Sequence, residues 1–265
     1  MPKVKTNGIQ MYYEEVGSGE PLILIMGLGA DHTKWEDHVA EYSRHFRCIL
    51  LDNRGAGMTD KPEGPYSTDI MADDTAGLMD ALGIYHARVA GISMGSAIAQ
   101  NLALKYPEKV RSMVLVSSWA RCSAYLKSLL SSFKKMRTVS QPGDFMELLQ
   151  LWIFTSEYFD ANIDDMRQGQ LDAENDEDSM PQYAFEAQCD ACSSHFTIDR
   201  LGEISAPALI TVGVKDIFTP PELSLEIHER MPSSELLQFP QWGHCHHWED
   251  LDMYNSRTVR FLKNH

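Results

Sequence analysis

The fold of this chain is decided by the stretch Val89-Ala90-Gly91-Ile92-Ser93-Met94-Gly95-Ser96-Ala97. It reads as the end of a buried strand, a sharp turn and the start of a helix, with a serine at the tip of the turn. Side chains at Gly91 and Gly95 would collide with the neighbouring strand and helix, so such a turn requires glycine at both places. The pattern predicts that the Ser93 hydroxyl enters a cleft, where the free N–H of Met94 and the helix dipole stabilise a developing negative charge.

The segments that flank Ser93 decide between a nucleophile and an ordinary helix N-cap serine. Residues 86–91 are strand-like, and residues 96–105 carry apolar side chains at helical spacing. An N-cap alone does not require the two glycines. We therefore interpret Ser93 as a nucleophile held on a strand-to-helix turn.

Composition limits the class of protein. The chain has 265 residues, of which 43% are hydrophobic, which fits one large core with or without an inserted subdomain. The net charge of −15 argues against a nucleic-acid partner. The sequence begins without an apolar signal core, and no apolar run approaches the roughly 18 residues of a membrane span, so we expect a soluble cytoplasmic protein, monomeric or homodimeric. Five cysteines fit reduced thiols better than a disulfide framework.

Strand and helix patterns alternate along most of the chain. Residues 3–16 predict a hairpin that turns at Asn7-Gly8. Buried strands are predicted at 21–26, 47–51, 86–91, 110–116, 207–213 and 235–239. Helices are predicted at 35–46, 68–82, 96–105, 220–231 and 248–263. This alternation predicts an α/β fold with a mostly parallel central sheet flanked by helices.

The alternation breaks at about Trp119 and resumes near Pro207. Helical patterns at 122–138, 143–156 and 180–194 fill the gap, so we predict a helical lid inserted between two strands. The expected division is a core of residues 1–118 and 201–265 with a lid subdomain of residues 119–200. Within the lid, residues 160–178 hold eight acids and one arginine, which favours a solvated, mobile connection.

A serine nucleophile needs a base to take its proton and a third group to orient that base. His244 is the best candidate base, because it follows the last predicted strand and a glycine. Asp216 is the best orienting group, because it comes directly after the strand at 207–213. Open parallel sheets bind ligands outside the carboxyl ends of their strands, and all three residues are expected there.

The N–H groups of Leu28 and Met94 are the expected pair of oxyanion donors. Leu28 lies in a Gly-Leu-Gly loop directly after the first buried strand, where a second donor is needed. We expect the substrate to contact four further residues, namely Gly27, Trp119, Trp152 and Phe218.

Five short motifs follow one another along the chain. They are Gly27-Leu28-Gly29, Asp52-x-Arg54-Gly55-x-Gly57, Gly91-x-Ser93-Met94-Gly95, Gly213-x-x-Asp216-x-x-x-Pro220 and Gly243-His244. Together they resemble the α/β-hydrolase superfamily with a helical lid, over essentially the whole chain, and the order serine, aspartate, histidine is that of its triads. The subgroup that the chain resembles most is the branch of 3-oxoadipate enol-lactonases and small carboxylesterases, and hydrolases of ring-cleavage products are also similar.

The chain departs from that family at two positions. The family usually has a histidine before the first oxyanion glycine, where this chain has Met26, so the rigidity of the loop is in question. Many relatives have glycine after Ser-Met-Gly, where this chain has Ser96, and we expect a slightly narrower pocket floor. A serine in place of an aspartate nucleophile argues against haloalkane dehalogenase and epoxide hydrolase chemistry.

Other residue clusters have competing interpretations. Cys189, Cys192 and His195 have a metal or redox spacing, but without a second cysteine pair they are expected to pack inside the lid. In Cys245-His246-His247, successive side chains point in different directions, so at most one is expected to share the site. We expect neither a metal nor a cofactor.

The loop residues beside the expected site also have two readings. Asp52 and Arg54 are expected to be structural, with the arginine bridging loops, as the resemblance implies. Asp31 and His32 either touch the substrate or cap their loop.

The first lid helix is basic on a strongly acidic chain. Its cations are Arg121, Lys127, Lys134, Lys135 and Arg137, with no acid between 121 and 138. One hypothesis is that they attract a substrate carboxylate. The plainer alternative is a solvated helix face.

The sequence therefore predicts a serine hydrolase that cleaves a small or medium carboxylic ester or lactone with an apolar portion, a carboxylesterase or lactonase. Three alternatives use the same residues. One is a C–C bond hydrolase of ring-cleavage products, the second is a perhydrolase or lyase, and the third is a ligand sensor with slow turnover.

Overall fold

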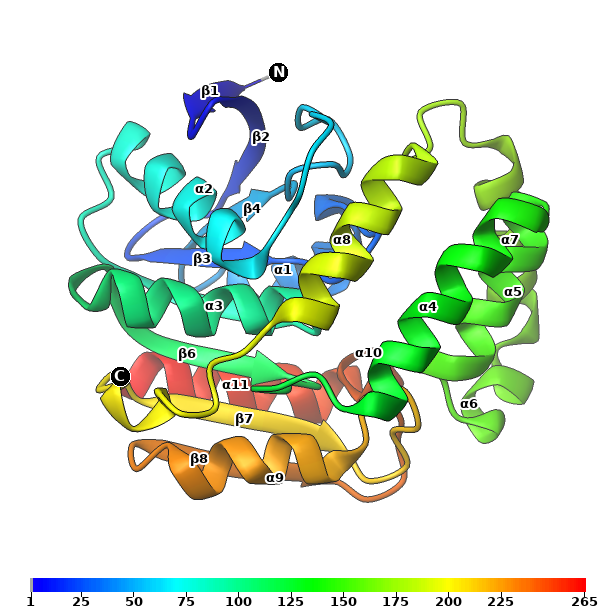
Figure 1. The fold of residues 1–265 in the computed structure, drawn as a ribbon. Helices are drawn as coiled ribbons and strands as arrows, with labels where there is room; N and C mark the ends of the chain where they lie inside the picture. Colours follow the sequence, from blue (N-terminus) through cyan, green and yellow to red (C-terminus); the bar gives the residue numbers. More distant parts are fainter. Residues whose placement is uncertain (1) are drawn as a thin grey trace.

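The computed structural model describes residues 2–265, which form an eight-stranded sheet in the order β1-β2-β4-β3-β5-β6-β7-β8 (Figure 1). The strands are β1 (Lys3–Thr6), β2 (Ile9–Val16), β3 (Pro21–Ile25), β4 (Arg47–Leu51), β5 (Ala87–Ile92), β6 (Val110–Val116), β7 (Ala208–Gly213) and β8 (Ser234–Phe239). β2 pairs antiparallel with β1 and β4, and the other neighbours are parallel. The fold is therefore the predicted α/β architecture.

The central strands are apolar on both sides because helices cover both faces of the sheet. Along β3, Ile23 and Ile25 join one apolar cluster, while Leu22 and Leu24 join the other. Figure 1 shows α2 (Thr68–Ala81), α3 (Met94–Lys105) and α9 (Pro221–Arg230) in front of the sheet. On the other face lie α1 (Glu36–Tyr42) and α11 (Leu251–Asn264), whose Tyr42 and Tyr254 belong to the second cluster.

Five helices lie between β6 and β7, and we call them the lid helices. They are α4 (Ala124–Val139), α5 (Pro142–Ile153), α6 (Ser156–Ala161), α7 (Ile163–Asn175) and α8 (Gln182–Ser194). Figure 1 shows them at the carboxyl ends of the strands, with α8 nearest to α2 and α3. The lid helices thus lie at the edge of the sheet where ligands bind in such folds.

The prediction for residues 160–178 was wrong in its secondary structure. This acidic stretch forms the end of α6 and all of α7. Met166 is buried, and its carbonyl accepts a hydrogen bond from Gln150 on α5, 3.0 Å away. α7 is stable because one side packs on α5 while the acids face solvent, a tertiary contact that charge composition does not reveal.

Two predicted helices are each divided in the structure. The segment at 143–156 ends at Ile153, and Thr155 caps α6 through its side chain. The segment at 248–263 is split at Asp250 into α10 (His246–Glu249) and α11. The two breaks lie close together, because Glu249 accepts hydrogen bonds from Thr155.

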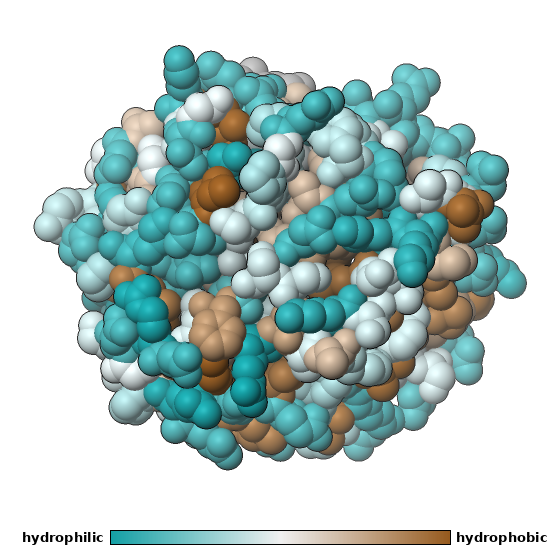
Figure 2. Space-filling model, in the orientation of Figure 1, coloured by the Kyte–Doolittle hydropathy of each residue, from teal (hydrophilic) through white to brown (hydrophobic). Residues whose placement is uncertain are grey.

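The surface in Figure 2 is mostly hydrophilic, with scattered apolar residues. Among residues 2–265, more than half of the large apolar side chains that are exposed belong to residues 119–200: Tyr125, Met136, Val139, Leu151, Leu171, Tyr183 and Phe196. Among the described helices, none has an apolar stretch long enough to cross a membrane.

Candidate active site

Ser93 lies on the turn between β5 and α3, and its backbone has φ 53° and ψ −114°. Residues other than glycine rarely adopt these backbone angles, so the surrounding structure must hold Ser93 in this conformation. A Cβ at Gly91 would lie 2.3 Å from the Gly95 carbonyl oxygen, and one at Gly95 would lie 2.1 Å from that of Ile25. Both glycines are therefore required for the close contact of β3, β5 and α3, as the sequence pattern predicts.

The Ser93 backbone is fixed at both of its polar groups. Its N–H donates to the Val116 carbonyl at the end of β6, 2.9 Å away. Its carbonyl accepts from Ser96 Oγ at 2.6 Å. Ser96 is fully buried, and its Oγ also lies 2.7 Å from Ser118 Oγ, from which it can accept. The Ser96 hydroxyl therefore supports the turn. Met94 begins α3, and its N–H belongs to the helix end that lacks intrahelical partners.

Asp216 and His244 form a hydrogen-bonded pair at the ends of β7 and β8. The distance from His244 Nδ1 to Asp216 Oδ2 is 2.9 Å, and both residues are buried. Asp216 also accepts from the N–H groups of Phe218 and Thr219 at 2.8 Å and from the Thr219 hydroxyl. An ionised carboxylate only accepts, so Nδ1 of His244 carries the proton and Nε2 is left as the basic nitrogen.

The end of β6 lies between the serine and the histidine. Ser93 N–H bonds to Val116, and the next residue, Ser117, donates through Oγ to the His244 carbonyl at 2.7 Å. A Cβ at Gly213 would lie 2.0 Å from the Gly243 carbonyl oxygen. The end of β7 and the loop of His244 are therefore in direct contact, which explains why residue 213 is a glycine.

The Gly27–Ala30 loop approaches the serine from β3. A Cβ at Gly27 would lie 3.3 Å from the Cβ of Ser93. The loop closes as a turn, with Ala30 N–H bonded to the Gly27 carbonyl. Within residues 2–265 the N–H of Leu28 has no hydrogen-bond partner, so it is free to act as a donor to a ligand.

The aromatic residues expected at the substrate lie at different distances from the histidine. The ring centroid of Phe218 is 4.7 Å from that of His244. Phe133 joins Phe218 to Trp152, with centroid distances of 5.6 and 6.2 Å. Trp119 is 1% exposed and packs edge-on against His195. The structure therefore brings Phe218 to the histidine, links Trp152 to it through one ring, and buries Trp119 against His195.

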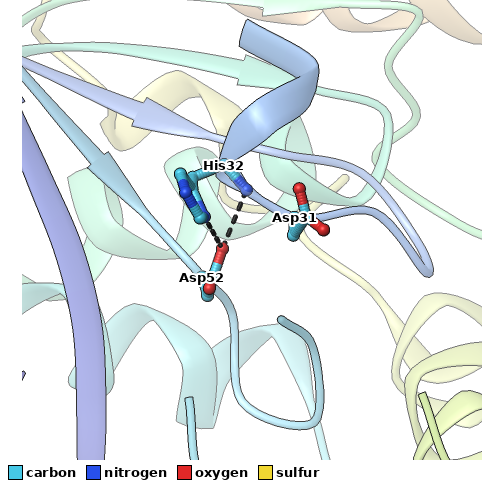
Figure 3. Close-up of side chains that lie close together, drawn as sticks. All are labelled: Asp31, His32 and Asp52. Carbon is cyan, nitrogen blue, oxygen red and sulfur yellow. Dashed lines mark hydrogen bonds and ion pairs between the residues drawn. The ribbon is translucent and has the colours of Figure 1, made fainter. Parts of the chain in front are cut away.

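Asp31, His32 and Asp52 lie together where the loops after β3 and β4 meet (Figure 3). Asp52 Oδ1 accepts from both the backbone N–H and the Nδ1 of His32 at 2.8 Å, and this bond raises the pKa of His32. Asp31 instead caps its own loop by accepting from Thr33 N–H. These hydrogen bonds hold the two loops together, in line with the alternative that Asp31 and His32 cap their loop.

Arg54 is structural, but it joins its loop to two helices and not to other loops as the resemblance implies. Its guanidinium makes two hydrogen bonds of 2.6 Å to Asp74 on α2. Its carbonyl accepts a 2.9 Å bond from Gln188 on the lid helix α8. Met26 makes a hydrogen bond in this region only through its carbonyl oxygen, and this oxygen accepts from the Asn53 side chain.

The cysteine–histidine cluster of the lid is packed, with protonated thiols and a neutral histidine. Cys189 and Cys192 are free thiols, and burial raises the pKa of Cys189 to about 12. His195 is hydrogen-bonded to the Thr68 and Thr197 hydroxyls, and burial lowers its pKa to about 3. Metal binding and redox exchange use the thiolate, so this environment suits packing.

The two histidines after His244 are structural partners. His246 bonds to the Thr211 hydroxyl at 2.9 Å, and His247 Nδ1 lies 3.1 Å from Nε2 of His38. Burial lowers the pKa of His246 to about 3 and that of His247 well below its ordinary value. Both side chains are therefore buried and hydrogen-bonded within the core.

Sequence reasoning missed four residues that support the site: Ser117, Gln188, Thr219 and Glu249. The pattern Asp216-x-x-Thr219 carried a usable signal, since an aspartate readily accepts from backbone N–H groups two and three residues later. Gln188 lies in the buried stripe of α8 with Phe185 and Cys192, where a polar side chain needs a partner. Neither signal identifies the partner.

The chain is similar to known proteins over most of its length. Residues 20–251 match the sequence profile of a family described as alpha/beta hydrolase fold. RutD of Azorhizobium caulinodans, a carbamate hydrolase by its proposed name, is 27% identical over 98% of each chain. The 2-hydroxy-6-oxo-6-phenylhexa-2,4-dienoate hydrolase of Comamonas testosteroni is 29% identical over 96% of this chain and 91% of its own.

A solved structure gives a close match in fold. The enol-lactonase from Burkholderia xenovorans LB400 superposes with a TM-score of 0.90 over 99% of this chain and 100% of its own. The two sequences are 23% identical, so this similarity concerns the fold.

Proposed function

Because the chain belongs to the α/β-hydrolase fold family and is a hydrolase, we propose that it cleaves a carboxylic ester or lactone through an acyl-enzyme on Ser93. The observation that carries the proposal is the buried hydrogen bond of 2.9 Å between Asp216 and His244. This bond leaves Nε2 of His244 as a base at the same edge of the sheet as Ser93.

The chemistry follows from these positions. Ser93 Oγ attacks the substrate carbonyl while His244 Nε2 takes its proton. The oxyanion accepts hydrogen bonds from the N–H groups of Leu28 and Met94. His244 then protonates the leaving alkoxide, and water repeats the sequence on the acyl-enzyme. Asp216 holds the imidazole in the required tautomer and stabilises its charged form. None of these steps needs a cofactor.

The lid helices supply the apolar side of the proposed substrate site. Phe218, Phe133 and Trp152 form a row of rings that starts at His244. Residues 119–200 would thus act as a lid that excludes water from the reaction. This row favours a substrate of small or medium size with an apolar portion.

The cations of the first lid helix are largely occupied by protein groups. Arg121 pairs with Glu226 at 2.8 Å and Lys134 with Asp190 at 2.7 Å. Arg137 donates to the Met180 carbonyl and to Gln182. These pairings favour the solvated-face alternative, and equal salt dependence of kcat/KM for acidic and neutral esters would support it.

The test is hydrolysis of p-nitrophenyl esters from acetate to decanoate by the wild type, Ser93→Ala and Ser132→Ala. We expect Ser93→Ala to lose about 10⁴-fold or more in kcat, because the nucleophile is absent. The Ser132→Ala control removes an exposed hydroxyl of α4 and should match the wild type. Equal activity of wild type and Ser93→Ala would exclude the acyl-enzyme.

A C–C bond hydrolase is the second candidate, and the relative from Comamonas testosteroni favours it. The name of that protein describes a hydrolase of a dienoate. Loss of the dienol chromophore with the wild type, without turnover of simple esters, would select this reaction. Ester turnover with no effect on the dienol would exclude it.

A further inference from the structure

The lid helix α8 makes direct polar contact with the loop that presents the oxyanion donor. Gln188 is fully buried, and its Oε1 accepts from the N–H of Gly29 at 2.9 Å. Its Nε2 donates to the Arg54 carbonyl at 2.9 Å. The orientation of the amide is fixed by its partners, since an N–H must face the oxygen and a carbonyl must face the nitrogen.

On the side that faces α8, few other contacts hold the Gly27–Ala30 loop. Gly29 has φ 74°, and a Cβ there would lie 3.5 Å from the Phe185 ring, one turn before Gln188 on α8. Met26, directly before the loop, has no side-chain hydrogen-bond donor. The loop conformation between Gly27 and Ala30 is therefore closed by one backbone turn and by α8.

We propose that Gln188 is a positioning residue, which fixes the Gly27–Ala30 loop from the lid so that the Leu28 N–H faces the oxyanion. This inference rests on the proposed function and names a residue that acts through Leu28. Its physical basis is that a donor stabilises the oxyanion only if it is held in place before the reaction. Without Gln188, the N–H of the exposed residue Gly29 loses its protein partner and the buried Arg54 carbonyl is left unpaired. The loop then has no hydrogen bond to α8.

The test compares Gln188→Met with Gln150→Met. Gln150 is the matched control because it is also a buried lid glutamine, which donates to the Met166 carbonyl and accepts from Gln170. Both substitutions remove two lid hydrogen bonds, but only the first touches the oxyanion loop. Thermal unfolding shows whether each variant is folded at the assay temperature.

We expect Gln188→Met to lower kcat about 10- to 100-fold with little change in KM, because a small displacement of a catalytic group acts mainly on the transition state. Labelling of Ser93 by a fluorophosphonate should slow by a similar factor, since the phosphonyl oxygen uses the same donors. Gln150→Met should stay near the wild type in both. Gln188→Glu, which keeps an acceptor for Gly29, should recover part of the labelling rate.

The outcomes separate this inference from the proposed function. If the wild type hydrolyses esters through Ser93 and Gln188→Met equals Gln150→Met in kcat and labelling, Gln188 is only structural and the inference is wrong. A rise in KM with unchanged kcat would also overturn it. If the wild type neither turns over esters nor is labelled at Ser93, the proposed function fails, and the role of Gln188 fails with it.

Discussion

The turn that carries Ser93 and the loop that carries His244 are held in place by different kinds of interaction. The serine turn is built from five consecutive residues, 91–95, and two glycines let backbones meet at distances that no Cβ permits. Its remaining supports are backbone hydrogen bonds and the buried Ser96 hydroxyl. The turn therefore depends on the sheet and on α3, and not on the lid helices.

The histidine loop is joined to the lid helices by hydrogen bonds of side chains and of one backbone N–H. Glu249 Oε1 accepts from the N–H and hydroxyl of Thr155, at 2.7 and 2.8 Å, and its Oε2 accepts from Gly243 N–H at 2.6 Å. Cys245 N–H donates to the Ile153 carbonyl at 3.0 Å. The serine turn should thus be sensitive to volume, and the histidine loop to charge and to the state of the lid.

The largest effect is expected from Gly95→Ala. The new methyl group would meet the Ile25 carbonyl oxygen at 2.1 Å, and because backbone cannot move aside as a side chain can, we expect a loss of about 3 kcal/mol or more of unfolding free energy. Denaturant titration measures it. Gly202→Ala is the control, since its nearest atom lies 3.9 Å away. Equal stability of the two variants would remove the steric basis of the comparison.

A smaller effect is expected from Glu249→Gln. An amide nitrogen would face an N–H donor on one side, so we expect a loss of about 1–3 kcal/mol of stability. We also expect kcat/KM to fall by about tenfold, since His244 shifts by a fraction of an ångström. Glu229→Gln, on the exposed end of α9, is the control. An unchanged kcat/KM in Glu249→Gln would show that the histidine loop does not need its tie to the lid.

Acid should loosen the histidine loop before the serine turn. The loop contains His246, whose pKa burial lowers to about 3, while the serine turn has no titratable side chain. The unfolded chain takes up protons near pH 6.5, so the stability that depends on neutral His246 is present above that pH and is lost as pH falls below it. Protection factors of the backbone amides, measured by hydrogen exchange, should therefore fall between pH 7 and pH 5. The fall should be larger in residues 240–249 than in residues 89–97.

The variant His246→Gln should reduce the loss of stability between pH 7 and 5, measured by denaturant titration. His86→Gln is the control, because His86 is exposed. His32 acts in the opposite direction, because its bond to Asp52 raises its pKa and its protonation favours the folded state. The two variants therefore test whether His246 causes the loss of stability at low pH. Identical slopes for His246→Gln and His86→Gln would contradict it.

The smallest effect is expected at the exposed tie between lid and triad loop. Lys215, next to Asp216, pairs with Glu157 on α6 at 2.7 Å, and both side chains are well exposed. Exposed ion pairs contribute little, so Lys215→Gln should leave the melting temperature and kcat unchanged. A clear loss of either would show that surface charge also holds the lid.

The elements beside the sheet were predictable, and the supports of the site were not. Apolar runs gave the strands within a residue or two, because burial on both faces leaves a continuous apolar signal. The helix α7 was missed because its eight-acid neighbourhood hides the single buried Met166. Thr219 lay within reach of local reasoning, whereas Gln188 bonds to Gly29 across 159 residues and Glu249 to Thr155 across 94.

The sequence by itself determined the serine turn, the position of the motifs near the ends of predicted strands, and the order of Ser93, Asp216 and His244 along the chain. These depend on short-range sterics and on periodic burial, which neighbouring residues encode. Only the tertiary structure decided which buried polar groups satisfy one another: Gln188 with the loop of Leu28, and Glu249 with Thr155. A buried hydrogen-bonding group must find a partner, but which one it finds depends on how distant segments pack, and no local pattern records that.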